Sequence, residues 1–200
     1  MASPDTTLDS GEKRVRAAAL PPSERRAEII ATTLPLLVEH GPAMTTRQIA
    51  EAAGIAEGTI FRVFEDKQAL IDAVVEAAID PAPTEAALRG IDTGLPLEER
   101  LVQAVEILRR RVANVFQVMA AAGNIPHSDR RPLAKPRPPE LHVLAQVFEP
   151  DLDQLDRDAH AAAHVLRGLT LVGTHPLLID DEPMTSAEIV ALFLDGTRRR

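Results

Sequence analysis

Eight residues between positions 45 and 67 are of types suited to contact with a phosphate backbone and with the edges of bases. Hydroxyls and N–H groups at a helix start suit a phosphate, an arginine reaches a guanine edge or a phosphate, and a glycine lets a backbone come close to its ligand. These candidate contact residues are Thr45, Thr46, Arg47, Gly58, Thr59, Phe61, Arg62 and Lys67. Their combined chemistry favours a surface that binds DNA.

The eight residues differ in what each offers. Arg62 projects from the outer side of a predicted helix and is placed to read bases, while Lys67 follows that helix and is placed for a phosphate. Thr59 offers a hydroxyl to phosphate or a methyl group to thymine. Phe61 offers only an apolar contact, or packs against its apolar neighbours instead. The negative charge of Glu57 at the start of the helix interacts favourably with the helix dipole. Acceptance of a hydrogen bond from a cytosine amine is the alternative role.

Two short helices joined by a tight turn must position these side chains. Thr45 with Gln48 three residues later predicts a capping box at the first helix, and Gly54 predicts a positive φ where that helix ends. The second helix, about 57–64, places Ile60 and the apolar residue four positions later on one side. This is a helix-turn-helix pattern, which offers its second helix to the major groove. The alternative is a helical pair that merely packs, and the polar outer side favours DNA.

The stretch TTRQIAEAAG, then I, then AEGTIFRVFEDKQAL resembles the DNA-binding domain of the tetracycline-repressor (TetR) family, over roughly residues 24–79. The resemblance implies an all-α fold, with an N-terminal three-helix helix-turn-helix DNA-binding domain and a C-terminal helical ligand-binding and dimerisation domain. It also implies a homodimeric repressor that a small molecule releases from a near-palindromic operator. The family commonly has tyrosine at the position of Phe61, which lacks the hydroxyl that would meet a phosphate.

Composition restricts the class of protein. The 200 residues include no Cys, Trp or Tyr, and the net charge is −8. No apolar run approaches the length that spans a bilayer, and the N-terminus lacks the pattern of a signal peptide. We therefore expect a cytoplasmic protein without disulfides or membrane contact. The acidic excess lies outside residues 12–67, so it does not oppose local binding of phosphates.

Apolar periodicity and proline positions divide the chain into three parts. Residues 1–22 are expected to form a mobile arm, residues 23–66 the DNA-binding domain, and residues 67–200 the helical domain, with 67–80 as a linking helix. Further helices are predicted at about 23–40, 84–92, 97–122, 139–148, 155–173 and from Thr185 onward, where Glu188 completes a second capping box. Pro35 predicts a kink in the first of them. The basic, proline-rich residues 123–139 are expected to form a solvated loop.

The C-terminal part offers candidates for a ligand pocket and for a dimer interface. The inward positions that would line a pocket are Leu108, Val112, Phe116, Met119, Leu144, Phe148 and Leu166. Plain core is the simpler interpretation of such apolar stripes, but the resemblance implies an effector site. Without Trp or Tyr, an apolar or amphipathic ligand is preferred. The last two helices are apolar on more than one side, which favours a homodimer through them.

Other chemistries find little support. His160 and His164 share a helix side at metal-ligand spacing, but neither a third ligand nor an HExxH arrangement is evident, so we expect no metal and no cofactor. No nucleophile elbow, phosphate loop or paired-carboxylate motif indicates an enzyme. The alternative to a DNA-binding regulator is a helical protein that binds a small molecule or a partner and has a degenerate DNA-binding head.

Overall fold

The computed structural model describes residues 21–123, 141–179 and 182–197, and all regular elements in these ranges are helices. In chain order they are α1 (Pro22–His40), η1 (Gly41–Ala43), α2 (Thr46–Ala53), α3 (Glu57–Val63), α4 (Lys67–Ile79), α5 (Ala82–Arg89), α6 (Leu97–Ala121), α7 (Leu141–Gln146), η2 (Glu149–Gln154), α8 (Ala159–Thr174) and α9 (Ser186–Thr197). The predicted all-α class is confirmed. Among the described helices, none combines the length and apolar character that a bilayer crossing requires.

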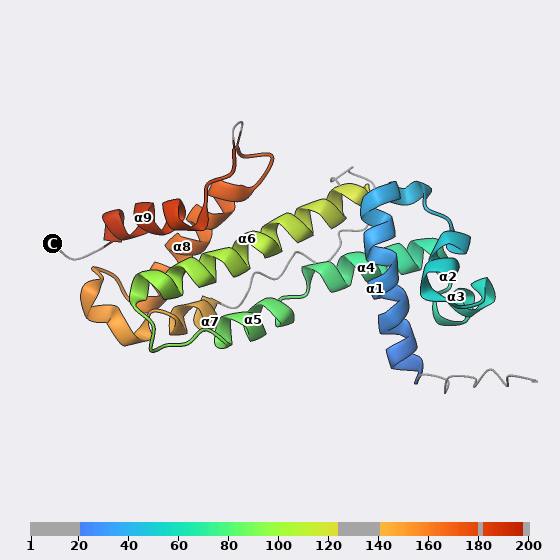
Figure 1. Cartoon of the computed structure of the whole chain (residues 1–200), viewed down its shortest axis with the longest axis horizontal. Helices are drawn as coiled ribbons and strands as arrows, with labels where there is room; N and C mark the ends of the chain where they lie inside the picture. Colours follow the sequence, from blue (N-terminus) through green and yellow to red (C-terminus); the bar gives the residue numbers. More distant parts are fainter. Residues whose placement is uncertain (1–20, 124–140, 180–181, 198–200) are drawn as a thin grey trace, which may run out of the picture.

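Two hydrophobic cores lie toward opposite ends of the elongated molecule (Figure 1). The first, which we call the head core, is built by α1 to α4, with Ile29, Ile49 and Ile60 fully buried. The second is built by α5 to α9 around residues such as Phe148 and Phe193. α4 contributes most of its apolar residues to the head core and then leads out of it. The predicted domain boundary at residue 66 remains a prediction.

The 25-residue helix α6 connects the two cores. Its first half places Leu101 and Leu108 in the C-terminal core, whereas Val118 and the following Ala122 lie in the head core. Arg111, between these ends, donates from its two terminal nitrogens to the carbonyls of Ile79 (2.7 Å) and Asp80 (2.8 Å), where α4 ends. α6 therefore holds both the head and the end of the linking helix.

Several predicted helix limits were wrong. The first helix begins at Pro22, not Ser23, because a proline suits the first helical position, where its missing N–H is not needed; α1 then continues through Pro35 as one helix. α8 begins at Ala159 rather than near residue 155. Asp158 accepts a hydrogen bond from the N–H of Ala161 (2.9 Å), which fixes the helix start there.

Shorter elements also shifted by a few residues. The helix expected at 84–92 is α5, and Gly90 already lies beyond its end. The helix expected at 139–148 is α7, which is shorter than predicted and is followed by the 3-10 turn η2. The predicted arm lies outside the described residues except for 21–22, and so does the predicted loop except for 123. Both of these stay predictions.

Candidate nucleic-acid interface

The helix-turn-helix has the local structure that its sequence predicts. Thr45 Oγ1 accepts from the N–H of Gln48 (3.2 Å), and Gln48 Oε1 accepts from the N–H of Thr45 (2.8 Å), which completes the capping box of α2. Gly54 ends α2 at φ 64°, a conformation that favours glycine. The N–H of Ile55 then bonds to the carbonyl of Ala50 (3.0 Å). These bonds fix the turn between α2 and α3.

Helix α3 is held by its apolar side and exposes the opposite side. Ile60 is fully buried, and Phe64, which follows α3, is nearly so. Arg26 of α1 covers the Phe64 ring, with its guanidinium carbon 5.1 Å from the ring centroid. The exposed residues of α3 are Glu57, Gly58, Phe61 and Arg62, with Thr59 half-buried. The spacing of the apolar residues thus predicted the inner and outer sides correctly.

Two residues on the outer side have no explanation in the protein's own packing. The Phe61 side chain is 51% exposed and does not pack inward, which was the alternative. A Cβ added to Gly58 would meet no atom within 4 Å, and the φ of Gly58 is not positive. Glycine is an unfavourable helix residue, and packing within the described residues does not require it at this position.

The three cations of the helix-turn-helix are in different states. Arg47 Nε donates to Glu51 Oε1 (2.9 Å), and this hydrogen bond raises the pKa of Arg47. Lys67 Nζ donates to the carbonyls of Pro42 (2.6 Å) and Met44 (2.8 Å), so it closes the turn between α1 and α2. Arg62 makes no hydrogen bond or ion pair within the described part of the chain.

These states revise what sequence reasoning offered for Lys67. Two of its three donors are used inside the protein, so at most one is left for a phosphate, and that expected contact stays a prediction.

Sequence reasoning also missed the roles of two acidic residues. Glu51 pairs with Arg47, and Glu57 accepts a hydrogen bond from the Thr46 hydroxyl, which ties α2 to α3. The i,i+4 spacing was a readable signal for the first pair but not for the second.

The seven predicted pocket residues do not form one lining. Leu108, Leu144, Phe148 and Leu166 are buried in the C-terminal core, where the Phe148 ring lies 5.6 Å from that of Phe193. Val112, Phe116 and Met119 are only partly buried on α6. Met119 packs against the head core, and the Phe116 ring meets His175 edge-on at 5.1 Å. The ligand role of all seven therefore remains a prediction.

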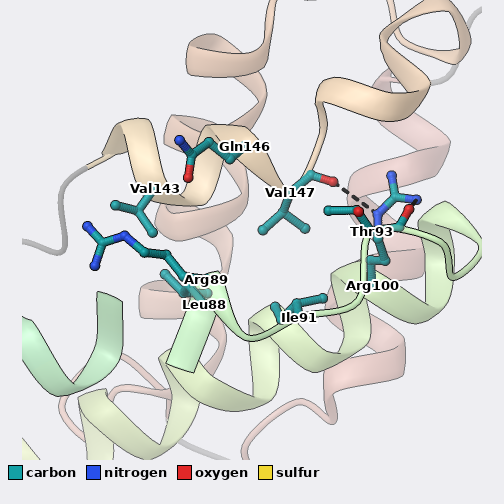
Figure 2. A pocket seen from close by; sticks show the side chains of 8 residues that line it. All are labelled: Leu88, Arg89, Ile91, Thr93, Arg100, Val143, Gln146 and Val147. Carbon is teal, nitrogen blue, oxygen red and sulfur yellow. Dashed lines mark hydrogen bonds between the residues drawn. The ribbon is translucent and has the colours of Figure 1, made fainter. Parts of the chain in front are cut away.

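A cavity of about 100 Å³ lies elsewhere, where α5, α6 and α7 meet. Figure 2 shows its lining residues, which include none of the seven: Leu88, Arg89, Ile91, Thr93, Arg100, Val143, Gln146 and Val147. Pockets for drug-sized ligands are typically about 300–1,000 Å³. This cavity is therefore too small for such a ligand in the conformation described.

Arg100 beside this cavity has a structural role. It is 1% exposed, and Nε donates to the Val147 carbonyl (3.1 Å; dashed in Figure 2). Its terminal nitrogens bind the carbonyls of Thr93 (3.3 Å) and Leu95 (2.6 Å) and a carboxylate oxygen of Asp151 (2.6 Å). Sequence reasoning missed this residue, although its spacing from Leu97 and Leu101 places it on the apolar stripe of α6.

A second outward surface lies on α8 and α9, and we call it the α8/α9 outer face. We define it by the half-buried Gly168 and the exposed Leu171 and Val172 of α8 and by the exposed Ala191, Leu192 and Gly196 of α9, and the exposed Asp195 adjoins it. Val172 and Leu192 are 58% and 52% exposed. A Cβ added to Gly168 or Gly196 would meet no atom within 4 Å, whereas one at Gly173 would meet the Met184 sulfur at 3.1 Å. Only Gly173 is thus explained by packing within the chain.

The chain is similar to known proteins over part of its sequence. Residues 29–74 match the model of the bacterial regulatory proteins of the tetR family. The segment of residues 29–74 is therefore similar to the DNA-binding domain of that family. Over 90 residues, or 43% of its length, the chain is 30% identical to the HTH-type transcriptional repressor KstR2 of Rhodococcus jostii, and the match covers 44% of that protein. Over 55 residues, or 27% of its length, it is 44% identical to 28% of the HTH-type transcriptional regulator YvkB of Bacillus subtilis.

Sequence similarity therefore spans less than half of each relative, whereas similarity of fold extends further. A structure described as a TetR-family transcriptional regulator from Mesorhizobium loti superposes with a TM-score of 0.62 at 19% identity. The match covers 90% of this chain and all of the other. At that identity it shows a shared fold, including the C-terminal helices, and it carries no further conclusion.

Proposed function

We propose that the protein is a cytoplasmic, homodimeric transcriptional repressor, whose α3 enters the major groove of a near-palindromic operator. The observation that carries this proposal is the outer side of α3. Gly58 has open space around it, and Arg62 is unpaired among the described residues. The similarity to the tetR family and the repressor named among the relatives support the same conclusion. Thr45, Thr46 and Arg47 at the start of α2 complete the proposed contact surface.

The proposed dimer forms through the α8/α9 outer face. Leu171, Val172 and Leu192 are exposed apolar side chains on two adjacent helices. The glycines and alanines beside them permit a close approach of a second copy. Two-fold symmetry also suits operator reading, because each copy then presents one α3 to one half-site.

Release by a small molecule is proposed to act through α6. This helix packs in both cores, and Arg111 fixes it to the end of α4. A ligand that displaces the partly buried side chains of Val112 and Phe116 would shift α6 against the head. The apolar character of these two side chains favours an apolar or amphipathic effector.

Selection of bound fragments from genomic DNA tests the proposal. The wild-type protein should enrich two-fold symmetric sequences, and Arg47→Ala should weaken their binding. A salt-dependent affinity is expected, because phosphate contacts release counterions. If no sequence is enriched while metabolites raise the melting temperature, the head does not read DNA. The alternative, a helical small-molecule-binding protein with a degenerate DNA-binding head, would then hold.

A further inference from the structure

The pair of Arg47 and Glu51 on α2 is not explained by the stability of that helix. Arg47 is the second residue of α2, where a positive charge opposes the helix dipole. The acidic partner follows the basic one, which is the weaker order for an i,i+4 pair. The two side chains are 81% and 63% exposed, so the ion pair adds little to folding. A role at the outer surface accounts for the pair better than a structural one.

The geometry of the pair leaves part of the arginine available. Glu51 Oε1 accepts from Nε of Arg47 at 2.9 Å, and no other hydrogen bond of Arg47 to a described residue is present. The two terminal nitrogens of the guanidinium therefore remain as a fork. Such a fork binds O6 and N7 of guanine, which is the commonest specific contact in the major groove.

The charges around Arg47 also work against simple phosphate binding. Residues 45–67 contain three cations and four carboxylates: Arg47, Arg62 and Lys67 against Glu51, Glu57, Glu65 and Asp66. Glu57 also lies near enough to raise the pKa of Arg47, after the larger effect of Glu51. The nearby carboxylates offset part of the attraction between Arg47 and a phosphate, whereas the terminal nitrogens keep their hydrogen-bond donors for a base.

We propose that Glu51 is a positioning residue that holds Arg47 with its terminal nitrogens directed to a guanine edge and keeps it from neutralising phosphates of unrelated sequence. The inference rests on the proposed DNA-binding function and adds how that surface discriminates between sequences. Glu51 lowers affinity for all DNA by its charge, and only a correctly placed guanine restores the loss. It therefore increases the ratio of specific to non-specific affinity.

The experiment compares Glu51→Gln with wild type on two duplexes of equal length, a sequence selected by the wild-type protein and a scrambled version. One additional phosphate contact steepens the slope of log affinity against log salt by about 0.9, which is roughly tenfold in affinity at low salt. For Glu51→Gln we expect this roughly tenfold gain in affinity on the scrambled duplex, and a change in affinity of less than about threefold on the selected duplex. Glu76→Gln removes the same charge from an exposed position on α4 and should change neither.

A double variant separates positioning from charge alone. In an Arg47→Ala background, Glu51→Gln should lose its effect on the ratio, because the two residues act as a unit. An unchanged ratio and salt slope in Glu51→Gln would overturn the inference, as would an effect that persists without Arg47. Absence of any selected sequence for the wild type would instead overturn the proposed function, and melting curves confirm that each variant folds.

Discussion

The outer side of α3 and the α8/α9 outer face both contain glycines with open space around them, but they differ in the side chains beside those glycines. Each carries glycines that the packing of the chain does not require, namely Gly58 on one and Gly168 and Gly196 on the other. Beside Gly58 the exposed side chains include the charged Glu57 and Arg62, whereas beside Gly168 and Gly196 they include the apolar Leu171, Val172 and Leu192. The comparison shows that packing within the described residues requires none of these three glycines. In the proposed function, the charged neighbours of Gly58 suit DNA and the apolar neighbours of the other two suit a second copy of the chain.

A charge on the apolar surface should have the largest effect. Leu192→Glu would place an unpaired carboxylate in the proposed dimer interface. We expect a loss of about 3 kcal/mol, or over a hundredfold in dimer affinity, because a buried unpaired charge is costly. Analytical ultracentrifugation measures the change. Val38→Glu, at an exposed apolar residue of α1, is the matched control and should leave the dimer intact. A dimer that persists in Leu192→Glu would place the interface elsewhere.

Removal of Arg62 from the outer side of α3 should have the next largest effect. Arg62→Ala is expected to weaken binding to selected DNA by about 1–3 kcal/mol, since a base or phosphate contact is lost. Gel-shift titration at fixed salt measures the affinity. Arg110→Ala removes an exposed arginine of α6 that pairs, among the described residues, with Glu106 one turn earlier, and it should have no effect. Equal affinities of the two variants would remove Arg62 from the contact surface.

Loss of the Arg111 contact, which joins α6 to the end of α4, should have a smaller effect than either of the two surface substitutions. Arg111→Met removes two hydrogen bonds to the last carbonyls of α4 and keeps much of the apolar stem. We expect a loss of about 1–2 kcal/mol in the free energy of unfolding, because the carbonyls lose charged donors. Urea denaturation checks this value. A change no greater than that of Arg110→Met would show that the contact does not hold α4 to α6.

The smallest expected effect is a loss of stability in acid at the N-terminal ends of α8 and α9. The N–H of Ala161 lowers the pKa of the Asp158 carboxyl, and the backbone of Thr185 lowers that of Glu188. A lowered pKa in the folded state means that the stabilisation is present at neutral pH. It is lost as pH falls below the ordinary values of 3.8 and 4.5 and through the folded values. Asp158→Ala should therefore melt a few degrees below wild type at neutral pH, and a difference that stays constant down to about pH 3 would contradict this.

Short-range signals predicted the head well. The Thr45–Gln48 box, the positive φ of Gly54 and the inward side of Ile60 depend on residues within one or two turns, so spacing alone indicates them. The structural role of Arg100 and the Thr46–Glu57 bond depend on segments that are distant in the sequence or joined by a turn. The seven predicted pocket residues do not share one lining, because four of them lie in the C-terminal core and Met119 packs against the head core. Apolar spacing within a helix does not indicate which core a side chain enters.

The most direct test of the central claim, that the outer side of α3 meets DNA, is to replace Gly58 by alanine and measure stability and DNA affinity together. The added methyl group meets no protein atom within 4 Å, and alanine favours helix over glycine by up to about 1 kcal/mol. We predict an unchanged or higher melting temperature with at least about tenfold weaker binding to selected DNA, since close approach is blocked. Undiminished binding by this stably folded variant would contradict the account.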